Sequence, residues 1–301
     1  MNPFKKYLTF LAAGLFWLLP VVVSAKAPVT IQVSILPQKY IVERIGKDRI
    51  HVDVLVKPGK SPEIYSPSPD QIKTLMAADI YFRIGIDFEN GIMDKIESFK
   101  GLKIVDTRDG IVLRDMKAHG HDAKDHDADL SKDKENHGHT GKDPHIWMSP
   151  ENVKIQAYTV FKTLSEFDPD GRAAYQINYD LFSRDMDDLD LRLKTILKDF
   201  KGTNIFVFHP AFGYFTDRYG LHQIAVETMG KAPKGKELSN IIKLAKKEKT
   251  RVIFVQPQFD RSAAEKIASA INGAVVSVDT LAYDYPANME SIAETIAKAL
   301  K

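Results

Sequence analysis

The sequence has no cysteine in its 301 residues. Disulfide bonds and thiolate metal sites are therefore excluded, and any bound metal ion must be held by nitrogen and oxygen atoms. A strong charge imbalance is also missing, because the formal net charge is +2 and no basic run is interleaved with aromatic residues. Such a composition does not predict a nucleic-acid partner. The hydrolase motifs HExxH and GxSxG are absent as well.

Long apolar runs are absent except near the beginning of the sequence. There, Lys5 and Lys6 precede the run "LTFLAAGLFWLLPVVV", and the small residues of "VSA" end at Ala25. This pattern predicts a secretory signal peptide, residues 1–25, that is cleaved after Ala25. An uncleaved membrane anchor is the alternative, but the run is short for a span and contains Pro20. We expect a mature chain in the periplasm, with no stable membrane insertion and, since cysteine is absent, no attached lipid.

Short runs rich in Val and Ile alternate with helical patterns in the rest of the chain. The runs typical of strands are residues 30–36, 51–56, 79–84, 103–107, 204–209, 251–257 and 274–280. Ser68, Pro69 and Gln71 form the pattern of a capping box at the start of one helix, and Ser149 and Pro150 mark the start of another. Alternating strands and helices are typical of parallel sheets covered by helices on both faces. The sequence therefore predicts the α/β class.

One stretch, from about Asp170 to Phe200, interrupts this alternation. Eight apolar or aromatic residues recur in it at alternating spacings of four and three: Tyr175, Tyr179, Phe182, Met186, Leu189, Leu193, Ile196 and Phe200. The pattern predicts one amphipathic helix about 45 Å long. A coiled-coil seam between two chains is the alternative, but a helix packed along two lobes better explains the strand–helix units on both sides. We expect a monomer with an N-terminal α/β lobe at 26–168, a rigid linker helix at 169–201 and a C-terminal α/β lobe at 202–301.

Four residues with metal-binding side chains occupy comparable positions. His209 and Asp279 end strand-like runs, Glu63 lies in a loop soon after another run, and His145 opens a helix. Because ligands of parallel sheets bind beyond the carboxyl ends of the strands, a site built from these residues would lie between the two lobes. Each has an ordinary alternative when taken alone: a histidine in the core, an aspartate that caps a turn, or a solvated glutamate.

A polar tract at residues 118–142 precedes His145. Five of the nine histidines of the chain lie in this tract: His119, His121, His126, His137 and His139. The tract has almost no apolar residues, so it cannot bury enough surface to offset the entropy of ordering, and we expect a flexible loop. His145 differs from these five because its neighbours in "DPHIW" are apolar and aromatic.

The chain resembles the zinc/manganese solute-binding proteins of bacterial ABC importers, a group often called cluster A-I. The matching segments are, in order, "VLVKPGKSPEIYSPSPDQIK", "DPHIWMSPEN", "FVFHPAFGYFTDRYGL", "KELSNIIKLAKKEKTRVIFVQPQFDRSAAEKIA" and "VVSVDTL". They span essentially the whole mature chain, and the His-rich acidic loop also fits the zinc-importing branch. The resemblance implies two α/β lobes joined by one long rigid helix, and a membrane permease of an ABC importer as partner.

The resemblance also implies a single metal ion in the cleft, held by up to four side chains. His145 matches the second ligand of the family, His209 the third and Asp279 the fourth. At the first position the family usually has histidine, where this chain has Glu63, so the expected set is two histidines and two carboxylates. Zn²⁺ accepts such a mixed set, and the His-rich loop favours zinc, with Mn²⁺ or iron as the alternative.

The histidines from His119 to His139 are then expected to form a second, weakly metal-binding arm; a solvated linker without function is the alternative. Two other classes of function stay open. An envelope zinc hydrolase would need an open coordination position and a general base, and a metal buffer or adhesin would act without a transporter.

Overall fold

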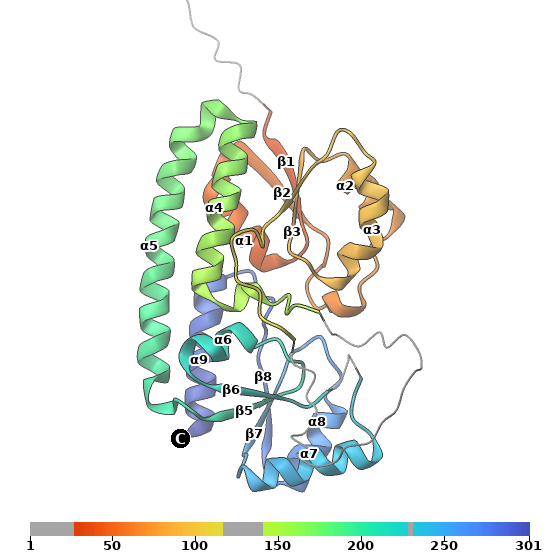
Figure 1. Ribbon diagram of the computed structural model, residues 1–301, viewed down its shortest axis with the longest axis vertical. Helices are drawn as coiled ribbons and strands as arrows, with labels where there is room; N and C mark the ends of the chain where they lie inside the picture. The colour runs from red at the N-terminus through yellow and green to blue at the C-terminus, as the bar shows by residue number, and fades with distance from the viewer. Residues whose placement is uncertain (1–26, 117–140, 228–230) are drawn as a thin grey trace, which may run out of the picture.

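The computed structural model describes residues 27–116, 141–227 and 231–301. Figure 1 shows two lobes, one above the other, with a long helix along one side of both. The predicted signal peptide at 1–25 and the five histidines from His119 to His139 lie outside the described residues. Within the described part of the chain, none of the helices combines the length and the apolar character needed to cross a bilayer.

The N-terminal lobe contains a four-stranded parallel sheet with the strand order β2-β1-β3-β4. Its strands are β1 (Val29–Val33), β2 (Ile50–Val54), β3 (Ile80–Arg83) and β4 (Lys103–Asp106). Its helices are α1 (Leu36–Gly46), α2 (Pro69–Met76), α3 (Asp87–Glu97) and α4 (Pro150–Phe167). Val33 and Phe82 are fully buried at neighbouring positions of β1 and β3, because the helices cover both faces of the sheet.

The C-terminal lobe contains a second parallel sheet with the strand order β6-β5-β7-β8. Its strands are β5 (Asn204–Val207), β6 (His222–Ala225), β7 (Val252–Val255) and β8 (Ala274–Ser277). Its helices are α6 (Gly213–Tyr219), α7 (Gly235–Lys247), α8 (Ser262–Ala270) and α9 (Tyr285–Leu300). The sequence did not predict β6, which is a short edge strand that begins with the polar residues His222 and Gln223.

The long helix is α5 (Arg172–Leu197), flanked by single 3-10 turns at Pro169–Gly171 and Lys198–Phe200. Its apolar stripe is buried inside the chain, against α1 and α4 of the first lobe and α9 of the second. The stripe is therefore covered by the chain's own helices and is not free to form the seam of a coiled coil. The fold class is confirmed as two α/β lobes joined by one long helix, whereas the lobe boundaries and the monomeric state stay predictions.

Local sequence signals decide where two helices that flank the site begin. At α2 the predicted capping box is formed: Gln71 N–H donates to Ser68 Oγ at 3.3 Å, and Ser68 N–H donates to Gln71 Oε1 at 3.1 Å. At α4, Ser149 occupies the N-cap position and Pro150 the first helical position, as predicted, but the Ser149 side chain makes no capping hydrogen bond.

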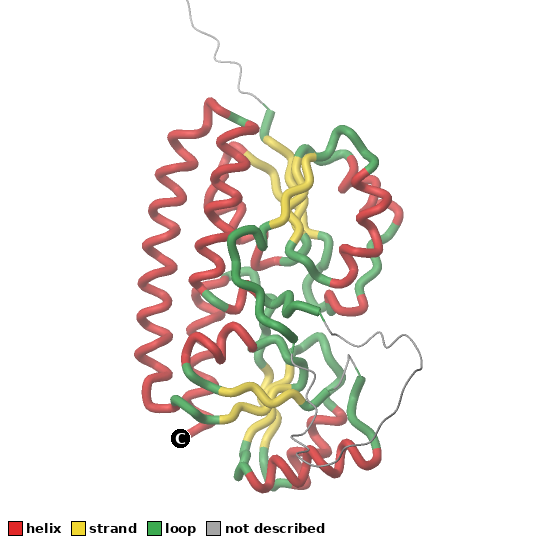
Figure 2. Tube along the Cα trace, in the orientation of Figure 1, coloured by secondary structure: helices red, strands yellow, loops and turns green. Residues whose placement is uncertain are grey.

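One large apolar cluster extends through both lobes. It includes Val33 of β1, Leu189 of α5, Ile205 of β5 and Met289 of α9, while a smaller cluster lies under α7 and α8. The lobes are therefore joined along the α5 side by a shared core. Figure 2 shows the two sheets apart, with loop segments between them. Several of these loops follow the carboxyl ends of strands and carry the candidate ligands.

Candidate metal centre

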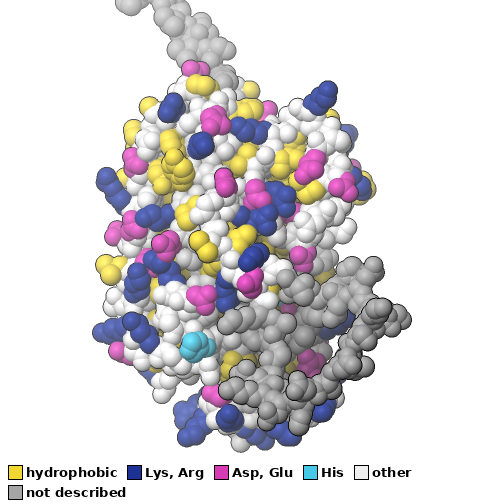
Figure 3. All heavy atoms as spheres, viewed as in Figure 1, with side chains coloured by type: hydrophobic (Ala, Val, Ile, Leu, Met, Phe, Trp, Pro, Cys, Tyr) yellow, Lys and Arg dark blue, Asp and Glu magenta, His cyan; other side chains and the backbone are white. Residues whose placement is uncertain are grey.

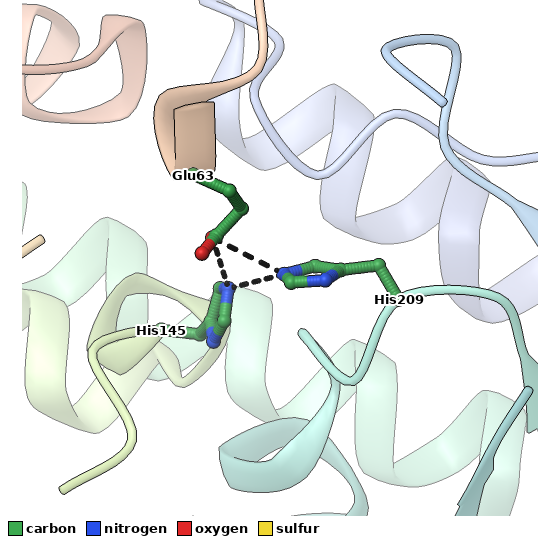
Figure 4. Close-up of side chains that lie close together, drawn as sticks. All are labelled: Glu63, His145 and His209. Carbon is green, nitrogen blue, oxygen red and sulfur yellow. Dashed lines mark hydrogen bonds and ion pairs between the residues drawn. The ribbon is translucent and has the colours of Figure 1, made fainter. Parts of the chain in front are cut away.

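Three of the predicted ligands meet between the two lobes. Glu63 comes from the 3-10 turn Pro62–Ile64 after β2, His145 precedes the turn Ile146–Met148, and His209 follows β5 by two residues. His145 Nε2 lies 3.1 Å from His209 Nε2, and Glu63 Oε1 lies 3.5 Å from His145 Nε2 and 3.2 Å from His209 Nε2. Figure 4 shows the three side chains pointing toward one another from different segments.

The loop that carries Glu63 is held by its own hydrogen bonds. Glu63 N–H donates to Ser61 Oγ at 3.3 Å, which fixes the short turn that begins with Pro62. Tyr65, two residues later, donates its hydroxyl hydrogen to Leu55 O at 2.6 Å. The loop is therefore tied back to the end of β2, so that the Glu63 side chain is directed between the lobes.

A buried carboxylate orients the ring of His145. Asp143 Oδ1 accepts hydrogen bonds from His145 Nδ1 at 2.8 Å and from His145 N at 3.0 Å. Arg114 Nη1 donates to Asp143 Oδ2 at 2.9 Å, so this fully buried carboxylate is neutralised. Because Asp143 holds the hydrogen of Nδ1, Nε2 is the nitrogen that faces the other two ligands and can bind a metal ion once it has lost its own proton.

A second carboxylate orients His209 in the same way. Glu227 Oε1 lies 2.5 Å from His209 Nδ1. Gln256 accepts from His209 N at 3.3 Å and donates to His209 O at 3.0 Å, and the ring of Phe259 stacks on the imidazole with centroids 4.8 Å apart. Both histidines therefore have Nδ1 engaged by a carboxylate and Nε2 free to bind a metal ion, the arrangement usual for metal-ligating imidazoles.

The charges around the site shift the protonation of its members. Burial lowers the pKa of His145, but its contacts with Asp143 and Glu63 outweigh burial and raise that pKa to about 9. The pKa of His209 is raised because Glu227 and Glu63 likewise outweigh burial. Burial opposes ionisation of Glu63, yet the two histidines hold its pKa well below the usual range. Without metal, the site thus favours a carboxylate beside protonated imidazole, and a metal cation would displace protons.

The three ligand atoms have the separations that a small cation requires. A tetrahedral ion bound at about 2.0–2.1 Å places its ligand atoms about 3.3 Å apart. The separations among Glu63 Oε1, His145 Nε2 and His209 Nε2 are 3.1, 3.2 and 3.5 Å. Two imidazole nitrogens and one carboxylate oxygen also form a chemically suitable set for Zn²⁺. These residues therefore fit one face of a tetrahedral coordination shell.

Asp279 is outside this group. Its Oδ1 accepts hydrogen bonds from Gln258 Nε2 at 3.0 Å and from Leu281 N at 2.9 Å. The residue lines a small cavity together with Lys57 and Gly59. Among the described residues, the candidate metal group therefore comprises three of the four predicted ligands, without Asp279.

The sequence did not indicate Asp143 or Glu227 as members of the site. Asp143 stands two residues before His145 in "DPHIW", a spacing that could have identified it as the partner of that ring. Glu227 is eighteen residues beyond His209 and follows β6, the strand that was not predicted, by two residues. No short-range sequence signal could have joined Glu227 to His209.

Comparison with known proteins identifies the family of the chain. Residues 31–299 match the model of the family described as zinc-uptake complex component A, periplasmic (ZnuA). A crystal structure of ZnuA superposes with a TM-score of 0.81 at 34% identity, covering 91% of this chain and 100% of the other. A deletion mutant of ZnuA, with zinc bound, gives a TM-score of 0.80 at 34% identity, covering 90% and 98% of the two chains.

Among curated sequences, the high-affinity zinc uptake system protein ZnuA of Yersinia pestis is 26% identical over 283 residues, which are 90% of this chain and 88% of that protein. The family match spans both lobes and every candidate ligand. The resemblance inferred from the sequence is thereby confirmed: the chain belongs to the ZnuA family of periplasmic metal-binding proteins that serve ABC importers.

Proposed function

We propose that this chain captures Zn²⁺ between its lobes through Glu63, His145 and His209 and delivers it to the membrane permease of an ABC importer. One observation carries the proposal: three ligand atoms lie 3.1–3.5 Å apart, and each imidazole is oriented by its own carboxylate. The zinc bound to a 34% identical ZnuA variant supports the choice of metal.

We further propose Asp279 as the fourth ligand. It follows β8 at the same edge of the sheet where His209 follows β5. Only Oδ1 of its carboxylate is engaged in hydrogen bonds within the described residues, which leaves Oδ2 able to bind a cation after a change in the side-chain torsion. A mixed set of two nitrogens and two oxygens suits Zn²⁺. Compared with a site richer in nitrogen, it reduces the difference in affinity between Zn²⁺ and Mn²⁺, the alternative metal, but Zn²⁺ still binds more tightly.

The ligands belong to different lobes, and this division provides a route for release of the metal ion. Glu63 belongs to the first lobe and His209 to the second, so a small separation of the lobes would break the shell without unfolding either sheet. Binding by protein ligands alone, with no catalytic step assigned to the site, fits a carrier. The periplasmic location of the family also fits our proposal that residues 1–25 are removed as a signal peptide.

Calorimetric zinc titration of the purified mature chain tests the proposal. We expect one tight equivalent, weakened at least tenfold, about 1.4 kcal/mol, by His145→Ala and by His209→Ala. His51→Ala is the matched control, since His51 is 69% exposed and belongs to β2. Competition with Mn²⁺ in the same assay tests the choice of metal. If both ligand variants bind zinc as tightly as the parent, the assignment of the metal site to these residues is wrong.

A further inference from the structure

One segment of the C-terminal lobe has a charge unlike that of the rest of the chain. Residues 231–251 contain eight basic and two acidic side chains, a formal charge of +6, whereas the whole chain carries +2. The remaining residues together are therefore negative. The segment includes α7 and the turn that leads into β7.

The basic side chains lie on the outer face of α7. Counted from Lys236, Lys243 lies seven residues and Lys247 eleven residues further along the helix. Both spacings are close to whole numbers of helical turns, so the three side chains form one row about 16 Å long. Ile241 and Ala245 lie on the opposite face and are buried in the smaller apolar cluster. Figure 3 shows Lys and Arg side chains gathered at the lower edge of the molecule, where Figure 1 places α7.

The row continues beyond the end of the helix. Lys246, Lys249 and Arg251 line a hollow of about 650 Å³, whose other wall includes Asn272 and Gly273. All eight basic side chains of residues 231–251 are exposed, and none forms an ion pair with a described residue. Within the parts of the chain that the structure describes, these cations are therefore not neutralised by neighbouring acids, and the hollow presents three positive charges to an anion.

We propose that this basic face, defined as Lys236, Lys243, Lys246, Lys247, Lys249 and Arg251, docks on an anionic phospholipid surface. Two features favour lipid over a protein partner. Protein interfaces are depleted in lysine and centred on aromatic or other large apolar anchors, but no large apolar side chain is exposed within residues 231–251. A dense row of lysines is instead the composition that an anionic membrane surface attracts, with a contribution from each residue.

The inference does not depend on the proposed metal site, because none of the six residues contacts Glu63, His145 or His209. Docking would hold a mature, water-soluble carrier at the membrane that contains its permease. The interaction is electrostatic and therefore weakens with salt, since charges farther apart than about 8 Å are largely screened at physiological ionic strength.

Vesicle flotation tests the inference directly. The zinc-loaded mature chain is mixed with vesicles of phosphatidylcholine alone, or of phosphatidylcholine with one quarter phosphatidylglycerol, at low and at physiological salt. We expect flotation only with the anionic vesicles and a decrease with salt. The triple variant Lys236→Gln, Lys243→Gln and Lys247→Gln should reduce the partition coefficient about a hundredfold.

The matched control removes three exposed lysines from the first lobe, Lys73, Lys95 and Lys100, also by substitution with Gln. It makes the same change in net charge and should partition like the parent. Zinc titration of both variants should equal that of the parent, which shows that both are folded. Equal loss in the two variants, flotation of the α7 variant at the level of the parent, or no flotation of the parent with the anionic vesicles would overturn the proposal.

Discussion

Replacement of Glu63 by alanine probes the site where this chain departs from its family. Glu63 supplies one of three converging ligand atoms, and its Oε1 lies within 3.5 Å of both ring nitrogens. We expect Glu63→Ala to weaken zinc binding at least tenfold, about 1.4 kcal/mol, because a ligand is replaced by water. Glu63→His should retain tight binding and increase the preference for zinc over manganese, since nitrogen replaces oxygen.

The size of this loss should depend on pH in a predictable direction. The pKa of His145 is raised to about 9, because contacts with Asp143 and Glu63 outweigh burial, so this ring holds a proton at pH 7 in the metal-free protein. Zinc must displace that proton, which weakens apparent binding about a hundredfold at pH 7, two pH units below the pKa. Removal of Glu63 lowers the pKa of His145 and relieves part of this competition. The loss caused by Glu63→Ala should therefore be larger at pH 9 than at pH 7.

Competition against a chromophoric zinc chelator at pH 7 and pH 9 measures both effects. Ile64→Ala is the control, because Ile64 is the adjacent residue in the same turn and its side chain is 86% exposed. If Glu63→Ala binds zinc like the parent at both pH values, Glu63 does not ligate the metal ion and its assignment as a ligand is refuted. A loss that is larger at pH 7 would refute the proton competition alone.

Three further predictions follow from other parts of the molecule. Deletion of residues 119–141 should preserve the tight zinc equivalent and the melting temperature but remove weaker equivalents in calorimetry, because the sequence of the tract has almost no apolar residues that could form a core. Asp143→Asn should weaken zinc binding about ten- to a hundredfold in the same titration, since it removes the charge that orients His145. Asp190→Asn should lower the free energy of unfolding by about 1 kcal/mol at pH 7 in urea titrations. Burial opposes ionisation of Asp190, but Arg218 and Lys194 lower its pKa to about 2, so this difference should shrink as the pH falls from 4 toward 2.

The sequence predicted the parts of the fold that depend on local pattern. The spacing of Tyr175, Phe182 and Leu189 was sufficient for α5, because an apolar stripe with helical periodicity must be buried against something. Strand β6 was missed because His222 and Gln223 make its pattern polar. Its position is determined by pairing with β5 at the sheet edge and by the bond from Phe212 N to Gln223 Oε1 at 2.7 Å, which are tertiary contacts.

The sequence also predicted part of the candidate site. Glu63, His145 and His209 were found because parallel sheets bring the ends of their strands together, and because the family resemblance assigns these positions. The pairing of His209 with Glu227 depends on how two loops meet and could not be derived from spacing. The placement of Asp279 beside Gln258 likewise depends on loop packing, which is why its role as a ligand stays a prediction.

The central claim is that one metal ion binds where Glu63, His145 and His209 converge. Anomalous diffraction at the zinc absorption edge, from crystals of the mature chain loaded with one equivalent of Zn²⁺, tests this claim most directly. The account predicts a single strong peak about 2.0–2.1 Å from His145 Nε2, His209 Nε2 and a Glu63 carboxylate oxygen, with Asp279 as the fourth ligand. A peak at any other position, with these three side chains unliganded, would contradict it.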